Sequence, residues 1–259
     1  MSPARVVVTG AGGGIGAALA RRFAADGARV VVNDLDAAAA ERVAAEIGGR
    51  AVPGDASNEE DVKRLVDVAW DELGGLDLFC ANAGVLAAGN QDTPNAAWER
   101  AWQVNVMSHV YASRALLPRW LDTEAGGRLL FTVSAAGLLT LLGSAPYSAT
   151  KHAALAYAEW LRATYAHRGV VVQALCPQGV RTDMLMTGGD SASKAQLAEG
   201  SLAPEEVAAV VAKALEGTAF LILPHPEVAD YYKLRADEPD RWLGGMNKIQ
   251  RSFDRSGLT

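Results

Sequence analysis

The sequence has few cysteines and no clustering of histidines. Among its 259 residues, only Cys80 and Cys176 are cysteines, too few for the disulfide scaffold of a small secreted domain. Both lie in apolar runs, so we expect reduced thiols buried in a core. The 4 histidines are scattered without metal-ligand spacing, and we therefore predict that the protein binds no metal.

Positive charge and long apolar runs are also scarce. Lys and Arg number 24 against 30 Asp and Glu, which leaves a formal net charge of −6. A mildly acidic chain without a basic stretch is a poor candidate for binding nucleic acid or an anionic membrane. No apolar run is long enough to span a bilayer, and the start of the chain lacks the pattern of a signal peptide. We therefore expect a soluble, cytoplasmic protein, and the 50% hydrophobic content excludes intrinsic disorder.

Short apolar runs alternate with longer amphipathic segments along the chain. The runs are continuously apolar, as in strands buried on both faces of a parallel sheet, and cover residues 4–9, 28–33, 49–52, 76–81, 128–133, 170–175 and 219–223. The amphipathic segments predict helices at residues 15–26, 37–47, 59–73, 98–121, 146–167 and 204–215. We therefore predict an α/β fold in a single domain, residues 1–223: a Rossmann-type, doubly wound parallel sheet of about seven strands with helices on both faces.

Two segments do not fit this alternation. Residues 184–203 are rich in Gly, Ser and Ala, and we expect a mobile substrate loop hinged at Gly188 and Gly189. Residues 224–259 carry several aromatic side chains. We expect this C-terminal extension to pack on the same domain or on a neighbouring subunit, and covering a substrate pocket is the alternative.

A glycine-rich turn joins the first predicted strand to the first predicted helix. Residues without a Cβ let a phosphate approach the backbone, and the following helix offers free N–H groups and the positive end of its dipole. A merely tight strand-to-helix turn is the alternative. The turn contains Gly10, Gly12, Gly14, Ile15 and Gly16.

Asp34 closes the second predicted strand. An acidic residue at this place accepts hydrogen bonds from the adenosine ribose, although a helix cap is an alternative for which Asp36 is better placed. Together with the glycine turn, Asp34 predicts dinucleotide binding. Its carboxylate would repel a 2′-phosphate, and no Lys or Arg lies in residues 11–14 or 35–40. The sequence therefore favours NAD(H) over NADP(H).

Tyr147 and Lys151 lie at i and i+4 of a predicted helix and share one face. A phenol ionises near pH 10, so acid–base work near neutral pH needs its pKa lowered by about 3, and an adjacent ammonium favours this. Alone, such a pair is more often a surface contact. Ser134 follows the strand at residues 128–133, at the carboxyl edge where open α/β sheets place their sites. Its hydroxyl either orients a substrate oxygen or caps the strand end.

In this order the motifs resemble those of the short-chain dehydrogenase/reductase family. The resemblance extends over residues 4–183 and implies catalysis by Asn105, Ser134, Tyr147 and Lys151. Tyr147 would be the general acid/base, and Lys151 would bind the nicotinamide ribose and lower the pKa of Tyr147. Ser134 would orient the substrate oxygen, and Asn105 would hold a water in a proton relay to Lys151.

The resemblance also implies the cofactor contacts. Asp55 would bind the adenine, residues 82–84 would flank the adenosine, and residues 177–182 would fix the nicotinamide. Two positions depart from the family pattern: Ala81 stands where Asn is commoner, and Gln178 replaces a glycine and either touches substrate or points to solvent. The predicted NAD-binding set is Gly10, Gly12, Gly14, Ile15, Gly16, Asp34, Leu35, Asp55, Ala56, Asn82, Ala83, Gly84, Tyr147, Lys151, Pro177, Val180 and Thr182.

Residues 135–143 and 184–186 are apolar and contain no cation, which predicts a small hydrophobic secondary alcohol or ketone as substrate. Arg181, the nearest cation, is expected to face outward. The predicted substrate contacts are Ser134, Ala136, Leu141, Tyr147, Gln178 and Met184. We therefore expect an NAD-dependent oxidoreductase; the alternatives are an NADPH-dependent ketoreductase and a non-catalytic NAD-binding sensor or scaffold.

The predicted helices at residues 98–121 and 146–167 carry more apolar residues than one flank of a sheet needs. The family resemblance implies that they pair across a two-fold axis in a homotetramer or homodimer. The alternative is that these side chains belong to the core. The apolar residues of these two predicted helices include Trp98, Trp102, Leu116, Trp120, Leu155 and Trp160.

Overall fold

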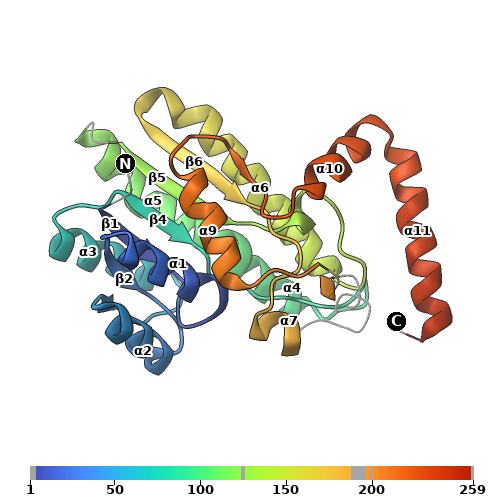
Figure 1. Cartoon of the computed structure of the whole chain (residues 1–259), viewed down its shortest axis with the longest axis horizontal. Helices are drawn as coiled ribbons and strands as arrows, with labels where there is room; N and C mark the ends of the chain where they lie inside the picture. The colour runs from blue at the N-terminus through green and yellow to red at the C-terminus, as the bar shows by residue number, and fades with distance from the viewer. Residues whose placement is uncertain (1–3, 124–125, 188–196, 199, 258–259) are drawn as a thin grey trace.

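The computed structural model describes residues 4–123, 126–187, 197–198 and 200–257. Seven parallel strands form one sheet in the order β3-β2-β1-β4-β5-β6-β7 (Figure 1). The order reverses beside β1, which marks the switch point of a doubly wound sheet. The predicted fold class is thus confirmed. The strands are β1 (Arg5–Val8), β2 (Arg29–Val32), β3 (Arg50–Ala51), β4 (Leu78–Ala81), β5 (Gly127–Thr132), β6 (Val170–Leu175) and β7 (Leu221–Ile222).

Helices cover both faces of the sheet. On one face α3 (Glu59–Leu73), α5 (Ser108–Asp122) and α6 (Ala145–Tyr165) bury their apolar sides. On the other face α1 (Gly14–Ala25), α2 (Ala37–Ile47) and α9 (Pro204–Ala214) do the same. Each strand contributes side chains to both cores because its side chains alternate between the two faces of the sheet.

The strand register aligns these alternating side chains into rows across the sheet. Val7 pairs with Val31 on one side and with Phe79 on the other, and the same row continues through Leu129 and Val172. All of them lie in one core, beneath α3, α5 and α6. The register therefore brings the carboxyl ends of β1, β4, β5 and β6 to one edge, where the loops that follow them meet.

Several predicted helix ends are confirmed. Asn58 caps α3 by accepting hydrogen bonds from the N–H groups of Glu60 and Asp61, and Gly74 ends the helix at φ 72°. Asp36 caps α2 by accepting a hydrogen bond from the N–H of Ala39 at 3.1 Å. Because Asp36 performs this capping, Asp34 is left available for another role.

The single helix predicted at residues 98–121 is interrupted by one wide turn. The structure has α4 (Asn95–Trp102), a π-helical turn η1 (Gln103–Met107) and then α5. An i→i+5 turn accommodates one more residue than an α-helical turn, and such turns often mark functional sites. The wide turn contains Asn105, one of the predicted site residues.

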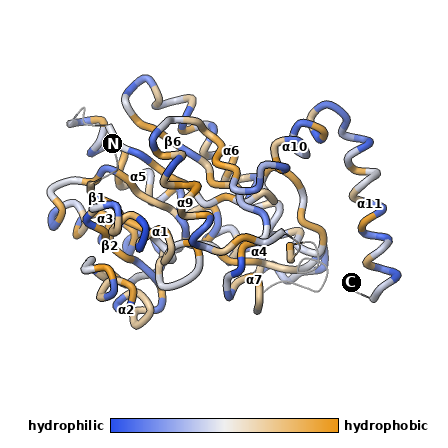
Figure 2. The backbone as a smooth tube through the Cα atoms, in the orientation of Figure 1, coloured by the Kyte–Doolittle hydropathy of each residue, from blue (hydrophilic) through white to orange (hydrophobic). Residues whose placement is uncertain are grey.

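The C-terminal extension forms two helices, α10 (Glu227–Asp237) and α11 (Pro239–Ser256). Val228 is fully buried, and Tyr232 and Trp242 pack against the core beneath α6. Farther along, α11 stands apart from the body of the molecule (Figure 1), and Figure 2 shows isolated hydrophobic positions along an otherwise polar helix. Of the residues in α11, Met246 is buried.

The remaining predictions concern loops and termini. The predicted hinge at Gly188 and Gly189 lies outside the described residues. Within the described part, α7 (Asp183–Thr187) occupies the start of the predicted substrate loop. No helix in the described part combines the length and apolar character that a membrane crossing requires.

Candidate active site

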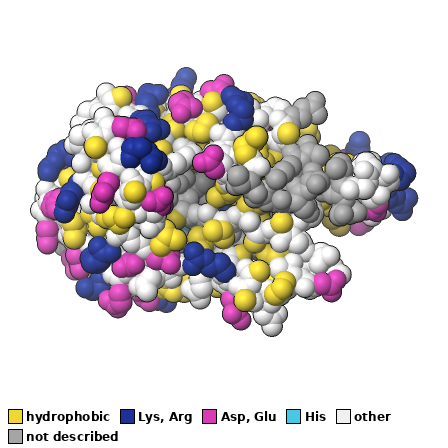
Figure 3. Space-filling model, turned by 90° about the horizontal axis from the view of Figure 1, so that it is seen from below, with side chains coloured by type: hydrophobic (Ala, Val, Ile, Leu, Met, Phe, Trp, Pro, Cys, Tyr) yellow, Lys and Arg dark blue, Asp and Glu magenta, His cyan; other side chains and the backbone are white. Residues whose placement is uncertain are grey.

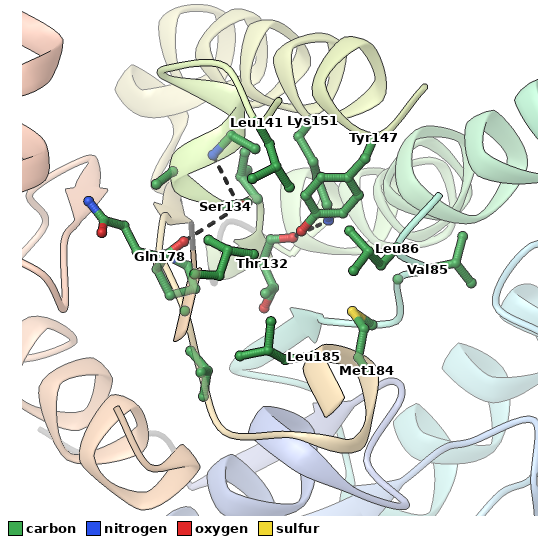
Figure 4. A pocket seen from close by; sticks show the side chains of 18 of the residues that line it. Val85, Leu86, Thr132, Ser134, Leu141, Tyr147, Lys151, Gln178, Met184 and Leu185 are labelled. Atoms are coloured by element: carbon green, nitrogen blue, oxygen red, sulfur yellow. Dashed lines mark hydrogen bonds between the residues drawn. The ribbon is translucent and has the colours of Figure 1, made fainter. Parts of the chain in front are cut away.

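A cavity of about 1240 Å³ runs along the carboxyl edge of the sheet (Figure 4). It brings together nearly all of the predicted site residues, from the glycine turn at one end to Met184 at the other. Gly12, Gly16 and Asn105 are not on its wall and lie behind it. The predicted residues on the wall are Gly10, Gly14, Ile15, Asp34, Leu35, Asp55, Ala56, Asn82, Ala83, Gly84, Ser134, Ala136, Leu141, Tyr147, Lys151, Pro177, Gln178, Val180, Thr182 and Met184.

The glycines of the first turn differ in whether a side chain would fit at their position. A Cβ on Gly16 would lie 2.1 Å from the carbonyl oxygen of Gly10, so packing alone requires glycine there. Gly13 is the N-cap of α1, and a Cβ placed on it would meet nothing within 4 Å. The turn is therefore tight on its protein side and open on its cavity side, where the first N–H groups of α1 are directed.

Asp34 is anchored by the backbone around it. Its carboxylate accepts hydrogen bonds from the N–H of Gly12 at 2.8 Å and from the N–H of Asp36 at 3.0 Å. The guanidinium of Arg42 donates to the carbonyl of Gly12 at 3.0 Å. Arg42 lies just beyond the residues in which the sequence shows no cation, so a positive charge does lie close to this turn.

The part of the cavity near Asp34 contains two further polar groups. Burial alone would raise the pKa of Asp55, but hydrogen bonds from Ser57 and the charge of Arg100, 3.6 Å away, hold that pKa below its usual range. Asn33, on the wall, donates to the carbonyls of Val52 and Gly54. Its side-chain oxygen is buried and finds no partner among the described residues. The residues present thus fit a dinucleotide: an open glycine turn, a fixed carboxylate and an unsatisfied acceptor.

Side chains tie together the strand ends beneath the centre of the cavity. The hydroxyl of Thr9 accepts hydrogen bonds from the N–H groups of Asn82 and Ala83, at 3.0 and 3.1 Å. The amide of Asn82 donates to the carbonyl of Thr9 at 3.0 Å and accepts from the hydroxyl of Thr132 at the same distance. These bonds join β1, β4 and β5, and they do not involve Ala81, whose departure from the family pattern leaves them intact.

Ser134 occupies an unusual backbone conformation. Its φ of 153° and ψ of 158° lie in a region that residues other than glycine rarely adopt. The N–H of Ala135 donates to the carbonyl of Pro177 at 2.8 Å, and this holds the segment in place. The Ser134 hydroxyl accepts a hydrogen bond from the N–H of Ala136 at 3.1 Å, so the side chain is fixed as well. Strained backbone of this kind concentrates at functional sites.

Tyr147 and Lys151 project from α6 into the same end of the cavity (Figure 4). The Lys151 ammonium donates to the carbonyl of Thr132 at 2.9 Å and lies 5.6 Å from the centre of the Tyr147 ring. Burial lowers the pKa of Lys151 to about 8. Burial also raises the pKa of Tyr147, and a hydrogen bond with the Ser134 side chain opposes that shift. The pair is thus not an ordinary surface contact, because Lys151 is 3% exposed.

Asn105 lies behind the wall and holds a loop. Its side chain accepts a hydrogen bond from the N–H of Val85 at 2.9 Å and donates to the Val85 carbonyl at 3.0 Å and to the Thr150 hydroxyl at 3.1 Å. A Cβ on Gly84 would lie 3.3 Å from the Asn105 side-chain oxygen and 3.5 Å from the Lys151 nitrogen. Asn105 and Lys151 therefore flank Gly84 from two sides.

The loop after β6 lines the same cavity as Ser134 and Tyr147. The N–H of Gln178 donates to the imidazole of His225 at 3.1 Å, and in Figure 4 the Gln178 side chain extends away from Ser134 and Tyr147. Thr182 closes over the glycine turn, because a Cβ on Gly14 would lie 3.0 Å from its methyl group. Arg181 bonds to Ser201 and Glu206 outside the cavity, as expected from the sequence.

The substrate end of the wall is largely apolar. Besides Leu141 and Met184, it includes Val85, Leu86, Leu139, Leu185, Leu197 and Leu234. The sequence left open whether residues 224–259 cover a pocket. In the structure, α10 and α11 contribute to the wall, with Tyr231, Arg241, Trp242, Gly244, Gly245, Met246, Lys248 and Ile249. A run of aromatic and aliphatic residues in an extension was the signal, but it did not tell which side of the molecule the helices would reach.

The topology, the glycine turn and the strand-end cavity define an oxidoreductase built on a nucleotide-binding Rossmann-type fold. Residues 4–192 match the family described as short chain dehydrogenase, and the chain belongs to this family.

Its relatives include named dehydrogenases. The 1-deoxy-11-beta-hydroxypentalenate dehydrogenase of Streptomyces exfoliatus is 39% identical over 91% of this chain and 87% of its own length. The meso-2,3-butanediol dehydrogenase of Serratia marcescens is 37% identical over 80% of this chain and 85% of its own. Among solved structures, a short chain dehydrogenase/reductase from Burkholderia phymatum in complex with NAD superimposes with a TM-score of 0.84 at 27% identity, covering 92% of this chain and 95% of that one.

Proposed function

We propose that the protein is an NAD-dependent oxidoreductase that interconverts a hydrophobic secondary alcohol and its ketone. One observation carries this proposal: Ser134, Tyr147 and Lys151 meet at one end of a single cavity, and the open glycine turn and Asp34 line the other. The pentalenate relative is named for a hydroxy substrate and the butanediol relative for hydroxyls at carbons 2 and 3, which supports a secondary alcohol.

Different residues would bind different parts of NAD. The N–H groups at the start of α1 suit the pyrophosphate, Asp34 the adenosine ribose, and Asp55 the adenine. Lys151 and the loop with Pro177, Val180 and Thr182 suit the nicotinamide half. Bound NAD would supply the ring that accepts or donates the hydride.

Tyr147 moves the proton in this proposal. During oxidation its phenolate accepts the proton of the substrate hydroxyl, and during reduction its phenol returns a proton to the carbonyl oxygen. Because burial raises the pKa of Tyr147 in the cofactor-free protein, the phenolate needs nearby positive charge. The Lys151 ammonium provides it while protonated, with a pKa of about 8.

Ser134 and Asn105 support that transfer. The fixed Ser134 hydroxyl would donate a hydrogen bond to the substrate oxygen and orient the carbinol toward Tyr147. The side chain of Asn105 positions the backbone of Val85, and the gap at Gly84 between Asn105 and Lys151 suits a water in a proton relay to Lys151. Asn105 is then a positioning residue.

The preference for NAD(H) rests on Asp34. Its carboxylate would accept hydrogen bonds from both ribose hydroxyls and repel a 2′-phosphate. Arg42 favours the alternative, an NADPH-dependent ketoreductase, because it lies at Gly12. Arg42 is already engaged with the Gly12 carbonyl and does not line the cavity, so we favour NAD(H). A non-catalytic NAD-binding sensor or scaffold would not need the buried Lys151.

The substrate contacts follow from the wall. Ser134 and Tyr147 would meet the oxygen, and Ala136, Leu141 and Met184 would meet the apolar part. Gln178 extends away from the two hydroxyls and would contact only the distal part of a larger substrate.

We further propose that the enzyme works in the cytoplasm as a homotetramer or homodimer. Trp102 and Trp160 are 45% and 55% exposed, which suits a surface that pairs with a second copy. Leu116, Trp120 and Leu155 are buried and belong to the core instead. Light scattering at micromolar concentration measures the assembly, and a stable monomer would contradict it.

A panel of secondary alcohols and ketones tests the proposed function. Turnover is followed at 340 nm with NAD(H) and, in parallel, with NADP(H). We expect kcat/KM to rise with the apolar area of the alcohol, since each buried methylene contributes up to ~0.8 kcal/mol. Binding of NAD without turnover of any alcohol or ketone would favour the sensor or scaffold.

A further inference from the structure

Helix α11 presents two kinds of side chain to the substrate end of the cavity. Trp242, Met246 and Ile249, at helical spacing, contribute an apolar side. Beside it run Arg241, Gly244 and Lys248, at i, i+3 and i+7, and all three also line the cavity. The two cations thus lie two turns apart with a glycine between them.

Gly244 has no packing role within the chain. A Cβ on it would meet nothing within 4 Å, and its conformation is helical, so no other residue is sterically excluded. A glycine inside a helix costs about 1 kcal/mol relative to alanine. At a position that lines the cavity, a glycine leaves helical backbone exposed between the two cations, and the neighbouring Gly245 does the same.

Charges of both signs lie around Gly244, and Lys248 is the cation without an acidic partner among the described residues. On the face of the molecule that Figure 3 shows, Lys and Arg side chains are likewise interspersed with Asp and Glu. Arg241 pairs with Glu238 at 2.9 Å and keeps a largely exposed side chain. Lys248 has no ion pair or hydrogen bond with any described residue. Asp183, in α7, also lines the cavity. The rest of the substrate end is apolar, so a ligand reaching from Ser134 to α11 would cross apolar wall and arrive at the two cations.

We infer that the substrate carries an anionic group, a carboxylate, at the end remote from its carbinol, and that this group binds over Gly244 between Arg241 and Lys248. Both residues then determine specificity without contacting the reacting atoms. This inference rests on the proposed function, which supplies the carbinol end. It also refines the sequence-based expectation, which found no cation near the predicted substrate loops because residues 224–259 were not placed beside them.

The test compares pairs of substrates that differ by a single negative charge. (ω−1)-Hydroxy fatty acids of increasing chain length are compared with their methyl esters, which keep the carbinol and the apolar chain but remove the anion. The enzymes are wild type, Arg241→Gln, Lys248→Gln and the double variant. Arg251→Gln is the matched control, because Arg251 is a cation of the same helix that does not line the cavity.

We expect the wild-type enzyme to prefer the acid through a lower KM, once the chain is long enough to reach α11. Each exposed cation should contribute about three- to fivefold at low ionic strength, and added salt should weaken the preference. The double variant should lose it, with kcat unchanged and the ester unaffected, while Arg251→Gln keeps it.

Three results would overturn the inference in distinguishable ways. Equal kcat/KM for acid and ester in the wild type would overturn the anion site and leave the alcohol dehydrogenase proposal intact. A double variant that loses activity equally on acid and ester, with a changed mass in light scattering, would show that α11 binds a second copy instead. No turnover of any acid, ester or neutral alcohol would overturn the proposed function and this inference together.

Discussion

The two ends of the cavity are built in different ways. The nucleotide end is made by strand-end turns whose side chains and backbone are fixed by many hydrogen bonds, such as those joining Thr9, Asn82 and Thr132. The substrate end is closed by α10 and α11, which come last in the chain, and much of α11 is exposed. In the proposed function, the sheet thus holds the residues of the reaction, and the part proposed to select a substrate is added at its margin.

This contrast predicts that substitutions at the two ends of the cavity have different effects. At the sheet end, one altered side chain disturbs atoms that are already fixed, so effects on catalysis and on folding should both be large. At the α11 end, side chains are exposed and effects should be limited to substrate affinity. The predictions below test the sheet end of this division, from the largest expected effect to the smallest, and the Arg241 and Lys248 variants described above test the α11 end.

Tyr147→Phe should remove most of the activity. The substitution deletes only the ionisable oxygen, and loss of a general acid/base typically costs 10²–10⁴-fold in rate. NAD binding, measured by calorimetry, should persist. Tyr157→Phe is the control: Tyr157 is also on α6, and its hydroxyl bonds to Ser113 at 2.6 Å, so it should affect stability and not turnover. Near wild-type turnover by Tyr147→Phe would identify another residue as the acid.

Asp34→Ser should change the cofactor preference. It removes the charge that repels a 2′-phosphate and leaves Arg42 near Gly12 as a cation for it. The ratio of kcat/KM for NADP(H) to that for NAD(H) should rise about 100-fold, since a hydrogen bond to a charged group is worth roughly 1.5–3 kcal/mol. Adding Arg42→Gln should reverse most of the gain. An unchanged ratio would mean that Asp34 does not face the ribose.

Lys151→Met should abolish turnover and yet stabilise the cofactor-free protein. Burial lowers the pKa of Lys151 to about 8 from its ordinary 10.5, so keeping its charge buried costs up to about 3 kcal/mol below pH 8. The variant also loses the hydrogen bond from Lys151 to the Thr132 carbonyl, and this loss offsets part of the gain in stability. The folded pKa lies below the unfolded one, so the cost is complete below pH 8 and fades between pH 8 and 10.5.

Urea unfolding of both proteins measures this difference across that pH range. The stability advantage of Lys151→Met should be largest near pH 7 and should shrink as the pH rises. A difference in stability that does not change with pH would indicate that it comes from packing and not from the buried charge.

Ser134 permits the smallest and most local test. Its backbone strain should cost about 1–3 kcal/mol, and glycine relieves this strain whereas alanine does not. Both Ser134→Gly and Ser134→Ala lack the hydroxyl and should lose activity similarly. Thermal unfolding should nevertheless show Ser134→Gly to be the more stable by about 1–2 kcal/mol. Equal stabilities would mean that the backbone relaxes once the hydroxyl is gone.

The sequence was sufficient to predict the sheet end, because short-range patterns specify it. A strand, a glycine turn and a helix follow each other without a gap, and Tyr147 and Lys151 share a helix face through their spacing alone. Helix caps such as Asn58 and Asp36 are equally local. These features depend on neighbours in the chain, which the sequence displays directly.

The sequence was not sufficient where a result depends on distant segments. Arg42, 30 residues further along the chain, donates a hydrogen bond to Gly12. Lys248 lines a cavity on whose wall the predicted catalytic residues follow β5 or lie on α6. Nor does amphipathic periodicity reveal the π turn within residues 98–121. A pattern of apolar residues locates a face of a helix, and it does not tell which surface that face will meet.

The π turn η1 has a consequence for the whole of this region, because it acts as a phase shift between two periodic helices. Each α-helical residue adds about 100° of rotation. Forcing Gln103–Met107 into regular α-helical geometry, with all of these residues kept, would rotate α4 by about that angle relative to α5, because a π turn accommodates one residue more than an α-helical turn. Trp102 would leave its present direction, and the side chain of Asn105 would turn away from Val85. The active site thus depends on the number of residues in this turn as well as on their identity.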